Sequence, residues 1–541
     1  MTHSPLTRPS TMRLLLALLC VLALTVACSQ ETDTSSSKET STPSAEGDRA
    51  TPQNRDSEAD SGEADNNGAS NHAAMPQLNV DATSPARLVD DQDRTVILRG
   101  VNINSLGDYH QGNTEFEPVL PLTDADWESM ASLGFNTIRL LLSWSRLEPT
   151  RGTLDTAYIE QINDTVEVAA QHGMYSILDM HQDAWGKSSA TPAGETCPPG
   201  LEPAIGWDGA PDWATITGGA TTCRESGSQR ESSAAVIAAW DNFYANTDSI
   251  MDALAETWGR LAAEFAQDHA IAGYDLLNEP NHGSTDEATV AGMSAFYGKA
   301  IAAIRAGEQQ AGGFSHPAFF ETTIRGVPPT AGFTTDTNLV FAGHNYGDSI
   351  SPIPLEATFA YFDSIAKSFN APLFIGEYGW FEDTPEAGEK LGRFAATEDK
   401  LLTSGATWWQ WRQACGDPHS VGKPGGVPTN QVHLLSNACP GDISGGVLPR
   451  WVCLWRPYPQ HAPGRLVTLT SACEGGSLHV EGEAATPAGA VLWVPGGPRP
   501  EPKISGTNLG TAEFEYNKGG WTVTVPVAAP GPYVIDVAIT K

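Results

Sequence analysis

Basic side chains are scarce in this sequence. It has 31 lysines and arginines against 65 aspartates and glutamates, which gives a formal net charge of −34 at pH 7. Nucleic acids and anionic lipid surfaces would repel a chain of this charge, so neither is expected as an electrostatic partner. The acidity instead favours a protein that stays soluble outside the cell.

The apolar run near the N-terminus is too short to cross a bilayer. It extends from Leu14 to Ala27, after Arg8 and Arg13, whereas a membrane-spanning helix needs about 20 residues. This pattern is typical of a secretory signal peptide. Its end resembles a bacterial lipobox, which predicts a membrane tether through a lipidated Cys28 at the cell surface. The alternative is ordinary signal cleavage and full release.

No Cys-x-x-Cys pair is present, and this absence argues against a zinc site. Beyond Cys28 the chain has six cysteines, an even number that favours disulfides in an oxidising compartment. Six cysteines allow about 15 sets of pairs. Pairing between sequence neighbours is the simplest set: Cys197 with Cys223, Cys415 with Cys439, and Cys453 with Cys473. We expect no metal and no other cofactor.

The composition divides the chain into four segments. Residues 1–28 are the predicted signal peptide, and residues 29–76 form an acidic, Ser- and Thr-rich linker that is too polar to fold. Residues 77–445 alternate strand-like with helix-like segments, and residues 446–541 change to short alternating runs, which predict an all-β sandwich. Carbohydrate binding and a structural appendage are both open roles for the sandwich, and we favour the second.

Eight apolar, strand-like runs lie in residues 77–445, separated by segments of helical periodicity such as Asp124–Leu133, Leu154–His172, Ala234–Asp268, Thr289–Ala306 and Ala387–Thr403. The runs are Val96–Asn104, Thr137–Trp144, Tyr175–Gln182, Ile271–Asn278, Ala318–Thr322, Leu339–Tyr346, Leu373–Glu377 and Ala406–Trp411. Eight such units predict an α/β fold, a (β/α)8 TIM barrel followed by the C-terminal all-β sandwich. In this barrel, catalytic groups gather at the carboxyl ends of the strands.

Two strings place a glutamate at such a strand end: Asn278-Glu279-Pro280 and Gly376-Glu377-Tyr378-Gly379. Cleaving a glycosidic bond needs one group that protonates the departing oxygen and a second that meets the charge at the anomeric carbon. Alone, either string would more often be a turn or a surface salt bridge. Because the barrel brings both strand ends to one mouth, we predict Glu279 as the acid/base and Glu377 as the nucleophile of a retaining glycosidase.

A long insertion, residues 187–230, follows the third predicted strand. It is rich in Gly, Pro and Trp and contains Cys197 and Cys223. Loops of this length are usually functional, so we expect a structured wall over the site. The alternative is a purely structural excursion.

The chain resembles glycoside hydrolase family 5. The general pattern of that family is met by Arg139, His181, Asn278-Glu279-Pro280, His344-Asn345-Tyr346, Glu377 and Trp408-Trp409-Gln410-Trp411. Longer strings are similar to the endoglycoceramidases within that family: Ser143–Pro149, Leu178–Asp183, Gly209–Ala214 and Trp409–Pro418. This resemblance implies hydrolysis of the β-linkage between a glycan and ceramide, with a glycosphingolipid as the substrate.

The resemblance also implies roles around the two glutamates. Glu279 needs a pKa raised by burial and by the neighbouring negative charge, whereas Glu377 must stay ionised. The remaining roles are Arg139 and Tyr346 holding Glu377, Asn278 bonding the sugar 2-OH, His181 and Asp183 bonding other sugar hydroxyls, His344 tuning Glu279, and Trp409 packing on the sugar ring.

Alternatives stay open at this point. In the alternative to these roles, Arg139 pairs only with a structural carboxylate and His344 is a core histidine. Trp411 competes with Trp409, because positions two apart on a strand point to the same side. For the whole protein, the alternatives are a β-glucanase or β-glycosidase acting on non-lipid glycans, and a surface protein that binds glycans without cleaving them.

Overall fold

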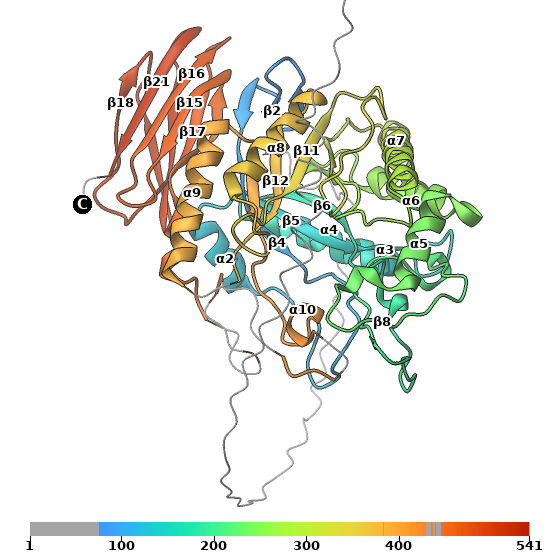
Figure 1. The fold of residues 1–541 in the computed structure, drawn as a ribbon. Helices are drawn as coiled ribbons and strands as arrows, with labels where there is room; N and C mark the ends of the chain where they lie inside the picture. Colours follow the sequence, from blue (N-terminus) through green and yellow to red (C-terminus); the bar gives the residue numbers. More distant parts are fainter. Residues whose placement is uncertain are drawn as a thin grey trace, which may run out of the picture.

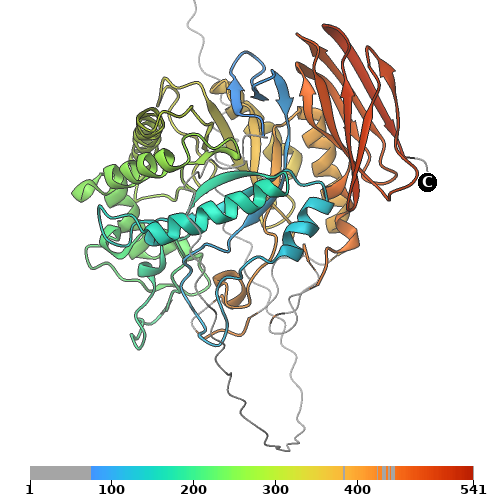
Figure 2. The ribbon, with the colours of Figure 1, turned by 180° about the vertical axis from the view of Figure 1, so that it is seen from behind.

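The computed structural model describes residues 75–381, 384–422, 425–428, 434–435, 439 and 445–539 (Figure 1). The predicted signal peptide, including Cys28, lies outside these residues, as does almost all of the predicted linker. The described residues form a barrel with two β-sheets packed beside it, next to helices α2 (Asp124–Ser132) and α9 (Pro385–Leu401) (Figures 1 and 2). Among the helices of this part of the chain, none is long and apolar enough to cross a membrane.

Eight parallel strands close into a barrel in the order β4, β5, β6, β9, β10, β11, β12 and β13. Their bounds are β4 Leu98–Ile103, β5 Thr137–Ser143, β6 Tyr175–His181, β9 Ile271–Asp275, β10 Ala318–Phe320, β11 Leu339–His344, β12 Leu373–Tyr378 and β13 Gly405–Trp408. Almost every strand residue is buried, as expected where helices cover the outer face and side chains fill the interior. Each predicted run overlaps one of these strands, so the TIM barrel is confirmed.

Helices cover the outside of the barrel. They are α2 Asp124–Ser132, α4 Thr156–Gln171, α5 Ala234–Tyr244, α6 Ile250–Glu264, α7 Asp286–Gln310, α8 Leu355–Ser368 and α9 Pro385–Leu401, with the short α3 Trp144–Leu147 and α10 Pro418–Val421. In α4, the Asp155 carboxylate accepts the main-chain N–H groups of Ala157 and Tyr158 and so caps the first turn. Ile162 and Val166, four residues apart, are buried on its inner face.

The helices differ from the sequence prediction in two places. The helical pattern predicted over Ala234–Asp268 is two helices, because Asn246, Asp248 and Ser249 between α5 and α6 have positive φ values of 53°, 48° and 57°. Helix α8 was not predicted. Its N-cap is Pro354, which offers no side-chain capping bond, and its start therefore carries no strong local signal.

The β region contains two sheets. Seven strands pair in the order β1-β2-β3-β14-β17-β20-β19, and four pair in the order β15-β16-β21-β18. Their bounds are β1 Leu78–Asp81, β2 Arg87–Asp90, β3 Arg94–Val96, β14 Tyr458–Pro463, β15 Arg465–Ser471, β16 Leu478–Ala484, β17 Gly489–Pro495, β18 Lys503–Thr507, β19 Glu513–Asn517, β20 Gly520–Pro526 and β21 Gly531–Ala538. Alternating buried side chains fill the space between the sheets, which confirms the predicted sandwich.

The larger sheet also takes in strands from before the barrel. Strand β14 pairs antiparallel with β3, with His461 opposite Val96. Residues 78–96 and the C-terminal strands are thus one hydrogen-bonded unit, although the barrel separates them in sequence. A buried cluster joins this unit to the barrel: Asp399 of α9 lies 2.9 Å from Arg99 of β4 and 3.2 Å from Arg456.

Three disulfides are formed: Cys197–Cys223, Cys415–Cys439 and Cys453–Cys473. The predicted pairing of sequence neighbours is confirmed. The first bond closes the insertion that follows β6, and the third lies between the barrel helices and the sandwich. Each bond therefore fixes a segment that has little regular structure of its own.

Candidate active site

Glu377 lies near the carboxyl end of β12, and both oxygens of its carboxylate are occupied. Arg139 Nη1 donates to Oε1 at 3.0 Å, and the Tyr346 hydroxyl donates to Oε2 at 2.9 Å. The residue is 4% exposed. A cation and a hydroxyl donor both stabilise the negative charge of a buried carboxylate. Glu377 is therefore held in a fixed position by a guanidinium group and a hydroxyl group.

Arg139 of β5 is the centre of this part of the site. Its guanidinium is fully buried and lies 3.0 Å from Asp179, 2.8 Å from Asp275 and 3.1 Å from Glu321, in addition to Glu377. It therefore does pair with structural carboxylates, as the alternative supposed, but it also holds Glu377. The same group donates to Asn102 and Asn278 at 3.1 and 3.0 Å.

Removal of Arg139 tests how far this cluster depends on one cation. We expect Arg139→Met to lower the free energy of unfolding by about 3–5 kcal/mol, because buried carboxylates would lose their counter-ion. Urea denaturation measures the loss. Arg393→Met is the matched control, since Arg393 pairs with Glu356 and Asp348 at the surface and should cost less than about 1 kcal/mol. Equal losses in the two variants would contradict the assignment.

Glu279 follows β9 and faces Glu377. Its main chain has a positive φ of 37°, and its N–H donates to Glu321 Oε2 at 2.9 Å. His344 Nδ1 lies 2.9 Å from Glu279 Oε1 and 3.5 Å from Glu377 Oε2. One atom from each of these three side chains lies within 4.8 Å of the other two. The barrel thus brings the two predicted glutamates together, with the His344 ring between them.

The pKa of Glu279 differs from the sequence expectation. Burial raises the pKa of this carboxyl, but the hydrogen bond and the positive charge of His344 more than offset it, so the pKa is lowered. For His344, burial acts in the opposite direction and lowers the pKa. The carboxylates of Glu321 and Glu377 more than offset burial, so the pKa of His344 is raised well above its usual value. The expectation of a raised pKa on Glu279 omitted this imidazolium, and in this structure it is wrong.

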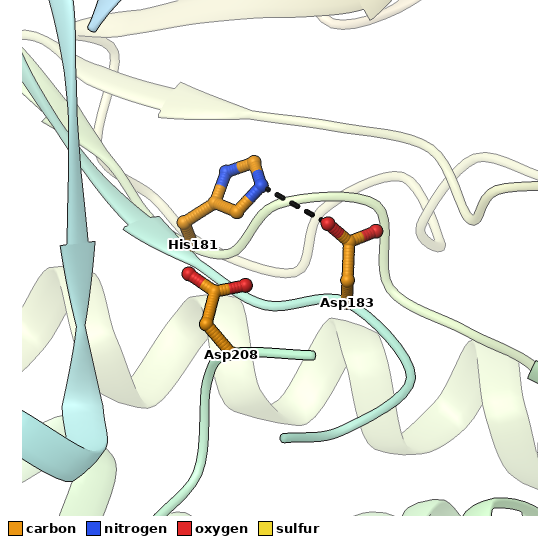
Figure 3. Close-up of side chains that lie close together, drawn as sticks. All are labelled: His181, Asp183 and Asp208. Carbon is orange, nitrogen blue, oxygen red and sulfur yellow. Dashed lines mark ion pairs between the residues drawn. The ribbon is translucent and has the colours of Figure 1, made fainter. Parts of the chain in front are cut away.

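His181 and Asp183 lie at the end of β6 (Figure 3). His181 Nδ1 is 2.7 Å from Asp179, and Nε2 is 3.4 Å from Asp183. Asp183 also forms an ion pair with Arg230, and the Asp208 carboxylate lies beside them. Burial opposes ionisation of Asp183, but the charge of Arg230 lowers its pKa. We assign no metal to this cluster, because Arg230 already supplies the positive charge.

The insertion after β6 is an ordered wall of this site rather than a remote excursion. It carries the two-stranded ribbon β7 Leu201–Glu202 and β8 Arg224–Glu225, and it delivers Asp208 and Arg230. The Ser143 hydroxyl donates to Asp208 at 3.1 Å, and burial raises the pKa of Asp208 to about 7. The Arg230 guanidinium lies 4.2 Å from the centre of the Trp207 ring.

A glycine allows the wall to approach the barrel. Gly209 has a φ of 127°, and a Cβ there would come 2.6 Å from the Trp185 carbonyl oxygen. Any larger residue would therefore displace the segment that carries Asp208. Asp208 and Arg230 were not among the predicted site residues. The signal that the sequence offered for Asp208 was its place directly after Trp207, in a Trp-containing string of the insertion.

Trp409, at the end of β13, lies at the site, and Trp411 does not. The Trp409 ring stacks on His181 with 5.4 Å between ring centres and 15° between planes. The Trp411 indole N–H donates to Asp126 of α2 at 3.0 Å, so its side chain is engaged with an outer helix. Of the two candidates that the sequence left open, Trp409 is the one that lies beside His181.

The remaining predicted residue, Asn278, lies between the two halves of the site. Its amide oxygen accepts from Arg139 at 3.0 Å, and its amide nitrogen donates to the Gln182 carbonyl at 3.1 Å. Glu321, directly after β10, completes the site but was not predicted as part of it. It is an acidic residue at a strand end, the same pattern that identified Glu279 and Glu377.

A closed (β/α)8 barrel whose strand ends bring two carboxylates face to face has the architecture of a glycoside hydrolase. Residues 89–414 match the model of the cellulase family, glycosyl hydrolase family 5, and the chain belongs to this family. The resemblance that the motifs predicted is confirmed.

Similar proteins of known structure include endoglycoceramidases. Endogalactoceramidase, known from a crystal structure, has 39% sequence identity to this chain. The comparison has a TM-score of 0.78 and covers 86% of this chain and 100% of endogalactoceramidase. Endo-glycoceramidase II from Rhodococcus sp., as a lactosyl-enzyme intermediate, has a TM-score of 0.66 over 84% of this chain and 100% of that one. At 22% identity, this second likeness shows the fold alone.

Curated relatives match over shorter stretches. Endoglycoceramidase from Cyanea nozakii is 28% identical over 217 residues, which are 36% of this chain and 40% of the relative. Endoglycoceramidase I from Rhodococcus hoagii (strain 103S) is 28% identical over 344 residues, which are 56% of this chain and 62% of the relative. The chain thus spans less than two thirds of either relative.

Proposed function

We propose that this protein is a retaining endoglycoceramidase, which hydrolyses the β-glycosidic bond between a glycan and the ceramide of a glycosphingolipid. The observation that carries the proposal is the pair Glu279 and Glu377, facing each other across His344 at the mouth of the barrel. The choice of substrate is supported by the names of the relatives, among them the endogalactoceramidase that is 39% identical to this chain.

The close approach of the two carboxylates supports retention of configuration. Retaining pairs are about 5–5.5 Å apart, whereas inverting pairs are about 6.5–9.5 Å apart to admit a water molecule. The nearest approach here is within 4.8 Å. The space between Glu279 and Glu377 suits direct attack on the anomeric carbon better than attack by an interposed water.

The reaction follows in two displacements. In the first, Glu377 attacks the anomeric carbon, the bond from that carbon to the ceramide oxygen breaks, and Glu279 gives this oxygen a proton. In the second, Glu279 takes a proton from water, the water oxygen attacks the anomeric carbon, and Glu377 leaves. Arg139 and Tyr346 stabilise the Glu377 carboxylate before the first step and again after the second.

The sugar next to the broken bond would lie against Trp409 and the cluster of His181, Asp183 and Asp208. Trp409 supplies an apolar face, and the cluster supplies acceptors and donors for sugar hydroxyls. Asn278 is held by Arg139 in a place from which it can bond the 2-OH.

Arg230 tests the contribution of the insertion. We expect Arg230→Gln to raise KM about tenfold or more, because Asp183 would lose a charge-assisted partner and lie beside a second buried carboxylate, Asp208. Initial rates over a range of substrate concentration measure the change. Arg224→Gln is the control from the same insertion, since Arg224 pairs with Glu202 at 3.1 Å. If both variants keep the wild-type KM, Arg230 has no role in binding.

A β-glucanase acting on non-lipid glycans is the second candidate, and the match to the cellulase family favours it. Detergent-solubilised glycosphingolipids and soluble β-glucans should therefore be offered to the same preparation, with the products identified by mass spectrometry. Release of an intact glycan together with ceramide supports the proposal. Cleavage of glucan alone would refute it in favour of the second candidate.

We also propose that the protein is exported and tethered to a membrane through a lipidated Cys28. The lipobox-like end of the apolar run supports the tether, and three disulfides support an oxidising compartment. Metabolic labelling with a radioactive fatty acid tests the proposal. Wild-type protein should be labelled in the membrane fraction, and Cys28→Ser should not. An unlabelled wild-type protein in the medium would indicate simple secretion.

A further inference from the structure

Glu321 contacts the predicted acid/base through two routes. One route is the main chain, because Oε2 accepts the Glu279 N–H at 2.9 Å. The other passes through His344: Glu321 Oε1 lies 3.2 Å from Nε2 of the ring, and Nδ1 on its opposite side lies 2.9 Å from Glu279 Oε1. Glu321 therefore fixes the backbone of Glu279 by a hydrogen bond and places a carboxylate beside His344, the partner of the Glu279 carboxyl group.

Glu321 is buried and hydrogen-bonded on several sides. The residue is 3% exposed, and Arg139 Nη2 donates to its Oε1 at 3.1 Å. The Tyr297 hydroxyl contacts both its main-chain N–H and its carbonyl oxygen, each at 3.3 Å. The titratable or charged groups that face Glu321 are Arg139 on β5, Asp275 on β9, Tyr297 on α7, His344 on β11 and Glu279 in the loop after β9.

Gly376 leaves room for the His344 ring between Glu279 and Glu321. A Cβ at Gly376 would come 2.9 Å from Nε2, on the strand that also carries Glu377. Burial raises the pKa of Glu321, the positive charge of His344 opposes that rise, and the carboxylates of Glu321 and Glu377 raise the pKa of His344. With the pKa of Glu279 lowered, a proton in this chain of three groups resides on His344 or Glu321 in preference to Glu279.

We propose that Glu321 is a positioning residue that keeps the catalytic proton on His344 and directs it through Nδ1 to Glu279. This inference rests on the proposed glycosidase function. In the first displacement, the N–H bond at Nδ1 breaks as Glu279 gains the proton that it delivers to the departing oxygen. In the second, Glu279 takes a proton from water and returns one to Nδ1. No proton is gained or lost over the cycle, and Glu321 stays beside Nε2 throughout.

Glu321→Gln tests the inference with two substrates. One is a glycosphingolipid, whose departing alkoxide needs a proton, and the other is a 2,4-dinitrophenyl β-glycoside of the same first sugar, whose leaving group needs none. General acid catalysis contributes about 10²–10⁴-fold. We expect kcat/KM to fall about 100-fold or more for the glycosphingolipid and less than about threefold for the dinitrophenyl glycoside.

The pH profile gives a second readout. Loss of the carboxylate beside His344 lowers the pKa of its imidazolium, so the proton needed for the first step is lost at lower pH. The alkaline limb of kcat/KM for the glycosphingolipid should therefore move down by about one pH unit or more in Glu321→Gln. Glu321→Asp, which keeps the charge, should give an intermediate shift.

Asp275→Asn is the matched control. Asp275 also pairs with Arg139, at 2.8 Å, but within the described residues it forms no ion pair with His344. If Glu321 had a purely structural role, Glu321→Gln and Asp275→Asn would each lower activity on the two substrates by the same factor. Activity on the dinitrophenyl glycoside reports the amount of folded enzyme. An unchanged substrate ratio and an unmoved alkaline limb in Glu321→Gln would overturn the inference. If the wild-type protein cleaves neither substrate, the proposed function itself has failed.

Discussion

Glu377→Gln should reduce turnover of every glycoside substrate at least about 10⁴-fold, because the variant lacks the atom that attacks the anomeric carbon. The amide is nearly isosteric with the carboxylate, so Arg139 and Tyr346 keep a neighbour of the same shape. The loss should be equally large for a glycosphingolipid and for a 2,4-dinitrophenyl glycoside, since both require the nucleophile. Steady-state rates on the two substrates measure it.

The control for this variant is a glutamate outside the site. Glu356 on α8 pairs with Arg393 at the surface, and Glu356→Gln should keep turnover within about twofold of wild type. Unchanged turnover in Glu377→Gln would remove Glu377 as the nucleophile. Absence of turnover in the wild-type protein, together with tight glycan binding, would favour the non-catalytic binding protein instead.

Glu279→Ala should have the second largest effect, and its pattern should differ from that of Glu377→Gln. Hydrolysis of a glycosphingolipid is expected to fall about 10²–10⁴-fold, because the departing oxygen would receive no proton. On a dinitrophenyl glycoside the first displacement needs no acid, so the glycosyl-enzyme should accumulate and only its hydrolysis should be slow. A pre-steady-state burst of dinitrophenol measures this accumulation.

Azide distinguishes the acid/base from other defects. A small anionic nucleophile needs no general base and can enter the space left by the missing carboxyl group. We therefore expect azide to restore turnover of the dinitrophenyl glycoside by Glu279→Ala, with a β-glycosyl azide as the product. Glu377→Gln serves as the comparison variant. With this variant, azide should not give a β-glycosyl azide. Failure of azide to change either variant would contradict the assignment of Glu279.

The barrel was predictable because each of its strands is a short apolar run between segments of helical period. The pairing of β3 with β14 was not, because the two strands are far apart in the chain and no local pattern specifies their register. Helix α8 was missed for a local reason, since its N-cap is a proline without a capping side chain. Local signals thus predicted elements, and long-range pairing required the structure.

In the active site, too, some residues were predictable from local sequence signals and others only from the structure. Glu279, Glu377 and their neighbours were found because strand ends converge in a barrel. Arg230 reaches the site from an insertion, and no periodic pattern indicates where such a chain folds back. The pKa of Glu279 was predicted with the wrong sign because it depends on the distance to a cation, 2.9 Å from His344, which a sequence does not give.

The anomeric configuration of the first product tests the account most directly. Proton NMR spectra recorded during early hydrolysis of a glycosphingolipid would show which anomer of the released glycan appears before mutarotation. With Glu279 and Glu377 as a retaining pair acting on the bond to ceramide, the intact glycan should appear first as the β-anomer, together with free ceramide. Initial release of the α-anomer, or of single sugars with the bond to ceramide still intact, would contradict it.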